Sequence, residues 1–189
     1  VNPVGERETY SSIIFLEPFT GRNLRAFGYD MFSEPVRRAA MERARDFDQV
    51  ALSAKVTLIQ ETSTDVQAGT LMYVPVYQRG QPRETVEQRR SALLGWVYSP
   101  YRMRDLIEGI QSLHERAGRD RVRFEIYDGD RIATETLLYE SEGGSAIRPR
   151  PVGLVTSRTI NFAGHRWTVL LKHDADPWNL DTRTILVFG

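Results

Sequence analysis

Two strand-like segments joined by a polar loop limit what the N-terminal half of this chain can form. Residues 70–78 and 92–98 are rich in β-branched and aromatic side chains, whereas the loop at 78–88 is polar. Strand, loop and strand in this order predict an antiparallel hairpin. Pro75 lies inside the first segment and withholds a ladder hydrogen bond, so we expect a sheet edge or a bulge there. Ser99-Pro100 is expected to end the second strand.

The C-terminal half repeats this pattern with tighter turns. Asp128-Gly129-Asp130 is a hairpin turn sequence between strand signals at 122–127 and 132–139. Residues 161–165 are typical of the turn between two further strands. This half is therefore expected to consist mostly of antiparallel strands. Further short strands are expected at 10–16, 50–53 and 56–60.

Two amphipathic helices are expected among these strands. Ser33-Glu34-Pro35 predicts a helix start capped by Ser33, because proline is tolerated in the first turn. This helix should run to about Asp46, with Arg37 among the charged side chains opposite its apolar stripe. A second helix is expected over 103–117, ended by Gly118. The expected apolar stripes are Val36, Ala39, Ala40, Ala44 and Phe47 in the first helix, and Leu106, Ile107, Ile110, Leu113 and Ala117 in the second.

Helices that are segregated from antiparallel strands define an α+β class, here in two units. The first unit reaches to about Pro100 and the second follows the 103–117 helix. The chain has 189 residues, of which 41% are hydrophobic and 26% charged, so it can bury a core in one large or two small domains.

Charge, cysteine content and missing motifs exclude several functions. The 25 Lys and Arg residues balance 25 Asp and Glu residues, which argues against a broad nucleic-acid footprint. The chain has no cysteine, so a disulfide, a thiol nucleophile and a cysteine-ligated metal are excluded. It carries no phosphate loop or nucleophile elbow, and His114, His165 and His173 are too far apart in the sequence to suggest a metal site. We expect no catalytic residue and no cofactor, although a hydrolytic carboxylate pair stays open because nothing selects one.

Asp30 is the one carboxylate with an unusual setting. It lies between aromatic and apolar neighbours in Gly28-Tyr29-Asp30-Met31-Phe32, just before the helix start. A carboxylate that loses water must find hydrogen-bond donors in the protein or in a ligand. Two roles stay open from the residues alone: contact with a ligand, or an Asx-turn that helps to begin the helix.

These segments resemble the CHASE domain, the extracytoplasmic sensory module of receptor histidine kinases and diguanylate cyclases. Order and spacing agree over about residues 10–110. The matching segments are 16–18, 23–30, 33–40, 42–46, 56–61, 73–77 and 95–98.

The resemblance implies two PAS-like lobes, each with an antiparallel sheet. A membrane-distal lobe would cover 1–100, a linking helix 101–118 and a membrane-proximal lobe 119–189. Members of the family begin with a stalk helix and a further strand ahead of the 10–16 segment. We therefore expect a fragment of a receptor that is anchored in the inner membrane, facing the periplasm or exterior, and homodimeric when whole.

The resemblance also implies a ligand pocket in the distal lobe. In cytokinin-binding relatives an aspartate at the position of Asp30 bonds the purine-like ring, and a backbone group at the position of Leu52 contacts it. The pocket walls would come from Tyr29, Val56, Leu58, Met72, Tyr73 and Tyr77. A charged acceptor in such a pocket selects a small molecule that bears N–H donors or a cation, such as a heterocycle. No nucleic-acid partner is expected.

Two other functions stay open beside a small-molecule sensor. The chain could be a protein-interaction or dimerisation module in which Asp30 is structural. It could also be a hydrolase or transferase, the weakest of the three, because the sequence offers neither a nucleophile nor a metal cluster.

Overall fold

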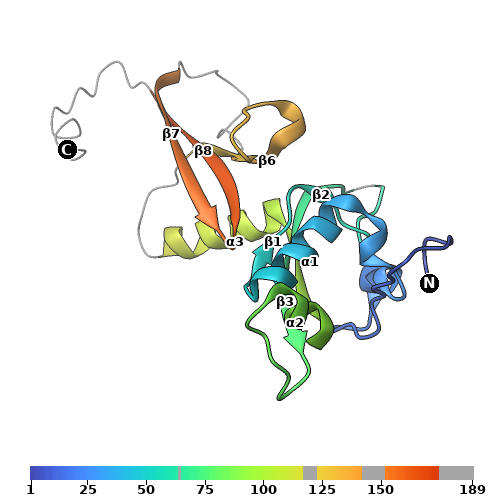
Figure 1. Cartoon of the computed structure of the whole chain (residues 1–189). Coiled ribbons are helices and arrows are strands. Elements are labelled where there is room, and N and C mark those ends of the chain that lie inside the picture. Colours follow the sequence, from blue (N-terminus) through green and yellow to red (C-terminus); the bar gives the residue numbers. More distant parts are fainter. Residues whose placement is uncertain (64, 117–122, 142–151, 175–189) are drawn as a thin grey trace.

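The computed structural model describes residues 1–63, 65–116, 123–141 and 152–174. It is an α+β structure with two antiparallel four-stranded sheets, as the sequence predicts. Figure 1 shows the N-terminal sheet and its helices in the lower part of the view and strands β7 and β8 above them, with helix α3 between.

The N-terminal sheet is built around one long strand. Strand β3 (Ala68–Tyr77) pairs along its length with β4 (Leu93–Arg102), and its other edge pairs with β1 (Ala51–Leu52) and β2 (Val56–Thr57). The predicted β3–β4 hairpin is therefore confirmed. At Pro75 strand β3 has β4 as its partner but has passed the end of β1, and a register shift follows between Val76 and Tyr77. The proline thus lies at a local edge next to a bulge, as its missing N–H requires.

Strand β4 does not end where the sequence suggested. It continues through Pro100, which pairs with Leu71, to Arg102. Proline is tolerated because β4 pairs with β3 alone among the strands described, so its missing N–H costs no ladder bond on the open side. The sequence also missed helix α2 (Val86–Ala92). Thr85 and Gln88 begin this helix with reciprocal side-chain hydrogen bonds, a capping box that the sequence carries as Thr-x-x-Gln.

Helix α1 (Pro35–Phe47) begins one residue later than predicted. Glu34, not Ser33, is the cap, and its carboxylate accepts hydrogen bonds from the backbone N–H groups of Val36 and Arg37. The Ser33 hydroxyl instead donates to the Asp30 carbonyl oxygen. Pro35 lies in the first turn as expected, where it occupies the first helical position.

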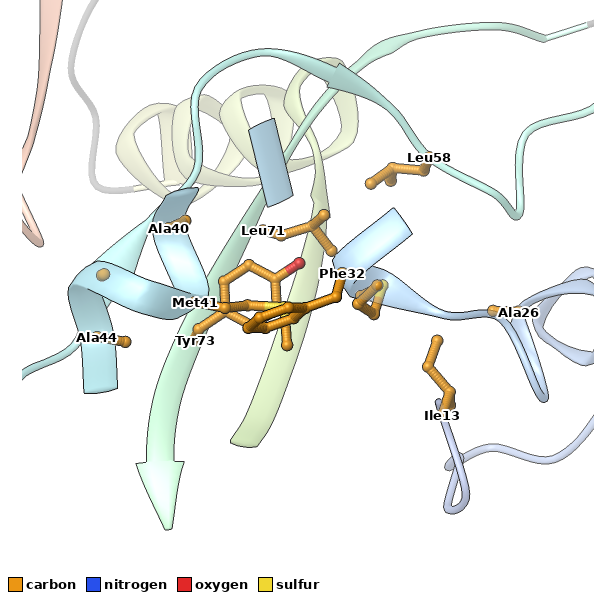
Figure 2. Close-up of a cluster of buried hydrophobic side chains, with 11 residues drawn as sticks. Ile13, Ala26, Phe32, Ala40, Met41, Ala44, Leu58, Leu71 and Tyr73 are labelled. Atoms are coloured by element: carbon orange, nitrogen blue, oxygen red, sulfur yellow. The ribbon is translucent and has the colours of Figure 1, made fainter. Parts of the chain in front are cut away.

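The buried face of α1 differs from the predicted stripe. Arg37, Ala40, Met41 and Ala44 are buried, whereas Ala39 and Phe47 are exposed. Ala40, Met41 and Ala44 lie three, four and seven residues after Arg37, which is also the spacing of one helical face. The core-facing side is therefore centred nearer Met41 than predicted, and Arg37 is buried with it. Figure 2 shows Met41 and Tyr73 packed together with Phe32.

The segment at 10–16 is not a regular strand. Ser12 forms an isolated bridge to Asp30, and Ile13 exchanges backbone hydrogen bonds with Gly28 and Tyr29. Ile13 is buried, but the next two side chains, Ile14 and Phe15, are 85% and 80% exposed. Pairing stops there, and the 3-10 helices η1 (Gly21–Ala26) and η2 (Met31–Ser33) lead into α1.

The C-terminal sheet has the order β6-β5-β8-β7. Its strands are β5 (Arg123–Asp128), β6 (Leu137–Glu140), β7 (Val152–Phe162) and β8 (His165–Asp174). The predicted turn between the last two strands is confirmed at Ala163 and Gly164, both with positive φ. A 3-10 helix, η3 (Thr134–Thr136), precedes β6, so the connection after Gly129 is longer than a tight hairpin.

Helix α3 (Met103–Arg116) joins the sheets. Met103 and Ile107 are buried in the cluster of the C-terminal sheet, but Ile110 and Leu113 are largely exposed, contrary to the predicted single buried stripe. The buried face of the helix runs through Met103, Ile107 and Gln111, and Ile110 and Leu113 lie on other faces. The predicted stop at Gly118, the loop at 140–151 beyond Ser141 and the final apolar residues 184–189 lie outside the described residues.

Candidate functional site

Asp30 is fully buried and has donors on both carboxylate oxygens. Oδ1 accepts hydrogen bonds from the backbone N–H groups of Ser11 (2.8 Å) and Phe32 (3.1 Å). The bond to Phe32 begins η2, so the turn role that the sequence left open is present in the structure. The carboxylate holds residues 11, 30 and 32 together without lining any of the cavities described below.

The second oxygen of Asp30 binds a cation from the N-terminal segment. Arg7 Nε lies 2.8 Å from Oδ2, and the Arg7 side chain is 21% exposed. Another nitrogen of the same guanidinium donates to the Pro3 carbonyl oxygen, and the group lies over the Tyr10 ring. A planar N–H donor therefore already occupies the side of Asp30 that points toward the N-terminal segment.

Both backbone groups of Leu52, the N–H and the carbonyl oxygen, form hydrogen bonds. Its N–H donates to the carbonyl oxygen of Ala163 (2.9 Å), and its carbonyl oxygen accepts from Arg43 (2.7 Å). Ala163 belongs to the β7–β8 turn, so Leu52 joins the two sheets. Nearby, the Lys55 N–H donates to Asp128, which also contacts His165 of that turn. His165 is thus part of the contact between the two sheets.

The remaining residues of the expected pocket are not gathered around one cavity. Tyr73 and Met72 point to opposite faces of β3, because successive side chains in a strand alternate. The Tyr77 hydroxyl donates to the carbonyl oxygen of Arg45, and the Tyr29 hydroxyl accepts from Arg37. Leu58 is packed in the core cluster of the N-terminal sheet.

Two spaces that share four lining residues lie between the 11–17 segment and the inner face of β3 and β4. The larger, here called the groove, measures about 340 Å³. The smaller, the inner chamber, measures about 10 Å³ and lies against Arg37. Ile13, Met31, Gln60 and Tyr98 border both spaces. Of the expected pocket residues, Tyr73 lines the groove and Leu58 the chamber.

The polar groups around these spaces include three without hydrogen-bond partners. They are Arg37 Nε and the hydroxyls of Tyr73 and Tyr98. Burial raises the pKa of both phenols, and the positive charge of Arg37 opposes this only in part. Both hydroxyls therefore stay protonated at neutral pH. Arg37 was expected on the solvent side of its helix, although its place four residues before Met41 could have indicated that it is buried.

A further cleft of about 910 Å³ lies between the sheets. Its walls come from β2, the start of β3, η3 and β6, together with Arg104 of α3. Val56 is on this wall, away from the groove. The Lys55 ammonium at the cleft donates to the Glu135 carbonyl oxygen (2.9 Å), so one of its cations is already bonded within the chain.

Two kinds of feature were not found within the described ranges. No group of three or more histidine or carboxylate side chains is placed to hold a metal ion there. None of the helices described is long and apolar enough to cross a membrane.

Known proteins that match this chain are signalling kinases. The model of the family described as CHASE domain matches residues 1–139. Hybrid signal transduction histidine kinase A of Dictyostelium discoideum is 22% identical over 188 residues, which cover 90% of this chain and 9% of that protein. Histidine kinase 2 of Arabidopsis thaliana is 24% identical over 188 residues, covering 98% of this chain and 15% of that protein. The chain therefore spans a small part of either relative.

Proposed function

This chain belongs to the CHASE domain family, and we propose that it is the extracytoplasmic ligand-sensing part of a membrane-bound receptor histidine kinase. Membership makes it a sensor domain of a signalling receptor and not the catalytic part. The proposed kinase output follows the two relatives, and a diguanylate cyclase output is the alternative that the family leaves open. Such a receptor is proposed to work as a homodimer.

The two sheets are proposed to be the two PAS-like lobes. Residues 1–100 would be the membrane-distal lobe, the helix within 101–118 the link and residues 119–189 the membrane-proximal lobe. Separate hydrophobic clusters support this division, because one is formed around α1 and β3 and the other around α3, β5 and β8.

A small molecule with N–H donors or a positive charge is proposed to bind at Asp30. Arg7 supports this choice, because its guanidinium is the kind of donor that a buried carboxylate selects. The ligand would compete with Arg7 for Oδ2, while the two backbone N–H groups keep holding Oδ1. Displacing Arg7 would release the Arg7–Pro3 contact and shift the N-terminal segment. The exchange therefore couples binding to a movement of that segment.

The contact at Leu52 offers a route from this site to the second sheet. A ligand that hydrogen-bonds the backbone of Leu52 must compete with Ala163 or Arg43. Competition with Ala163 would weaken the docking of the β7–β8 turn on β1. A ligand that binds one arrangement of the two sheets more tightly shifts the equilibrium between arrangements toward it. This shift in population is the proposed signal.

Calorimetric titration of the chain with adenine and with benzamidine tests this proposal. Adenine presents one ring N–H and an exocyclic amino group as donors, and benzamidine presents a planar cation similar to Arg7. We expect Asp30→Asn to weaken binding and Arg7→Ala to strengthen it, because the first removes the acceptor charge and the second removes the competitor. Arg79→Ala, in the exposed loop after β3, is the matched control. Equal affinities in all four proteins would remove Asp30 and Arg7 from the binding site.

Exposed apolar side chains favour one second candidate, a protein-interaction module. Ile14 and Phe15 stand beside the groove, and Leu94 and Val97 of β4 are also largely exposed. Sedimentation at rising concentration, with Phe15→Ser as the variant, tests this function. Self-association that Phe15→Ser abolishes, without any response to adenine or benzamidine, would favour it over ligand sensing.

A further inference from the structure

Arg37 is a buried cation that has no counter-ion among the described residues. Its side chain comes from the first turn of α1 and is 3% exposed. Its terminal nitrogens donate to the Tyr29 hydroxyl (3.1 Å) and to the Thr57 carbonyl oxygen (2.8 Å), both of which are neutral. Nε has no partner, and within the described residues no carboxylate forms an ion pair with this guanidinium. Burying a charge is costly unless an opposite charge and full hydrogen bonding compensate for it.

Two phenols next to Arg37 also have a polar group without a hydrogen-bond partner among the described residues. Tyr73 is 1% exposed, Tyr98 is half-buried, and neither hydroxyl has a partner. Their ring centres are 6.1 Å apart, so they are neighbours across β3 and β4. Each phenol can donate one hydrogen bond, and a guanidinium can only donate. The unpaired set therefore lacks an acceptor that carries negative charge.

From these contacts we infer that the groove and the inner chamber form a binding site for an organic carboxylate, recognised by Arg37, Tyr73 and Tyr98. The inference rests on the proposed function, because it names the chemical class of a ligand held by the same sheet. It adds an anion-binding end that lies apart from Asp30.

The sizes of the two spaces decide what shape the ligand has. The inner chamber of about 10 Å³ holds little more than one water-sized group. The groove of about 340 Å³ is at the small end of ligand pockets and fits one ring or a short alkyl chain. Met31, Met41 and Trp96 give the groove apolar walls. The ligand is therefore an apolar body in the groove, with its carboxylate at Tyr73 and Tyr98 and one carboxylate oxygen directed into the chamber toward Arg37.

Side chains at the boundary control how the carboxylate reaches Arg37. Met31 and Gln60 border both spaces, together with Ile13 and Tyr98. Methionine is flexible enough to change rotamer without breaking a hydrogen bond. A small rearrangement of Met31 is thus expected on binding, directly beside Asp30.

Thermal shift and calorimetry with matched pairs of acids and amides test the inference. The probes are benzoate, phenylacetate and hexanoate, each with its primary amide, at constant ionic strength. At least one acid should raise the melting temperature, whereas its amide should not, because the amide lacks the charge. Arg37→Gln should weaken binding of that acid by about 10- to 100-fold, the range of a charge-assisted hydrogen bond. Arg37→Lys should recover part of the affinity, and Arg79→Gln is the control.

The phenol variants keep the test decisive if Arg37→Gln does not fold. Tyr73→Phe and Tyr98→Phe each remove a hydroxyl that has no partner, so the ligand-free protein should melt at the same temperature or higher. Both variants should nevertheless bind the acid more weakly. Higher stability together with lost affinity marks groups that are kept for a ligand and not for the fold.

The outcomes separate this inference from the proposed function. If every amide stabilises the wild type as well as its acid, or if Arg37→Gln binds the acid normally, the carboxylate site is overturned. If adenine or benzamidine binds while all three acids fail, the inference falls and the proposed function stands. If none of these probes binds, both fail.

Discussion

The two sheets of this molecule differ in how four of their tyrosine hydroxyls are bonded. In the C-terminal sheet the Tyr127 hydroxyl donates to Glu125, and the Tyr139 hydroxyl donates to Gln111. In the N-terminal sheet the hydroxyls of Tyr73 and Tyr98 have no partner in the part of the chain that the structure describes, and the same holds for Nε of Arg37.

This difference separates hydroxyls that stabilise the fold from hydroxyls that a ligand can bind. A pair that is satisfied within the chain stabilises one packing and has nothing to offer a ligand. Unpaired donors cost stability and can recover it only from an outside acceptor. The Tyr73–Tyr98 pair of the N-terminal sheet is thus open to a ligand, whereas the hydroxyls of Tyr127 and Tyr139 are already bonded within the chain.

The largest expected effect concerns the two methionines at the centres of the cores. Met41→Ala and Met103→Ala should each lower the free energy of unfolding by about 2–5 kcal/mol, because both side chains are buried. Met103→Ala should fall at the upper end, since Met41 borders the groove and its neighbours can move into the space. Urea unfolding of the two variants measures this. A larger loss at Met41 would mean that the N-terminal core is as tightly packed as the other.

A matched pair of phenols tests the comparison directly. Tyr139→Phe should cost about 1 kcal/mol of unfolding free energy, because it leaves Gln111 short of a hydrogen bond. Tyr73→Phe should cost nothing or be stabilising, since its hydroxyl is unpaired. Equal losses in both variants would show that Tyr73 is bonded in solution, and the contrast between the sheets would disappear.

Acid should act on the N-terminal unit through Asp46. Hydrogen bonds from Arg90 and Arg45 hold the pKa of this carboxyl well below its usual value of 3.8. Because the folded pKa is depressed, the stabilisation is complete above pH 3.8 and is lost as the pH falls toward the folded pKa. Urea midpoints measured from neutral pH downward should therefore decline less steeply below this value in Asp46→Asn. An identical acid slope in variant and wild type would contradict this role.

The smallest effects should come from backbone strain, which the two units share. Asp48, after α1, and Ala163, in the β7–β8 turn, have φ values of 50° and 48°. Replacing either with glycine relieves a left-handed conformation but frees the unfolded chain, so each should change stability by less than about 1 kcal/mol. Thermal unfolding of Asp48→Gly and Ala163→Gly would show this. A loss above that size at Ala163 alone would point to its contact with Leu52 and sharpen the view of how the sheets are coupled.

Part of the site could be predicted from the sequence because it depends on local chemistry. Asp30 was identified by its neighbours, and the structure does bury it completely. Its partners could not be found in the same way, since Arg7 lies 23 residues away along the chain. The ligand contacts expected at Asp30 and Leu52 remain predictions.

The sequence by itself determined the α+β class, the antiparallel hairpins and a helix with Pro35 in its first turn, since strand propensity, turn residues and caps act over a few neighbouring residues. Only the tertiary structure decided which face of that helix is buried. Two stripes on α1 satisfied the helical period, and the choice between them depended on how Met41 and Ala44 meet the sheet. Arg37 was predicted to face solvent but lies in the core, because rotating a helix against a sheet changes the burial of every side chain on the helix at once.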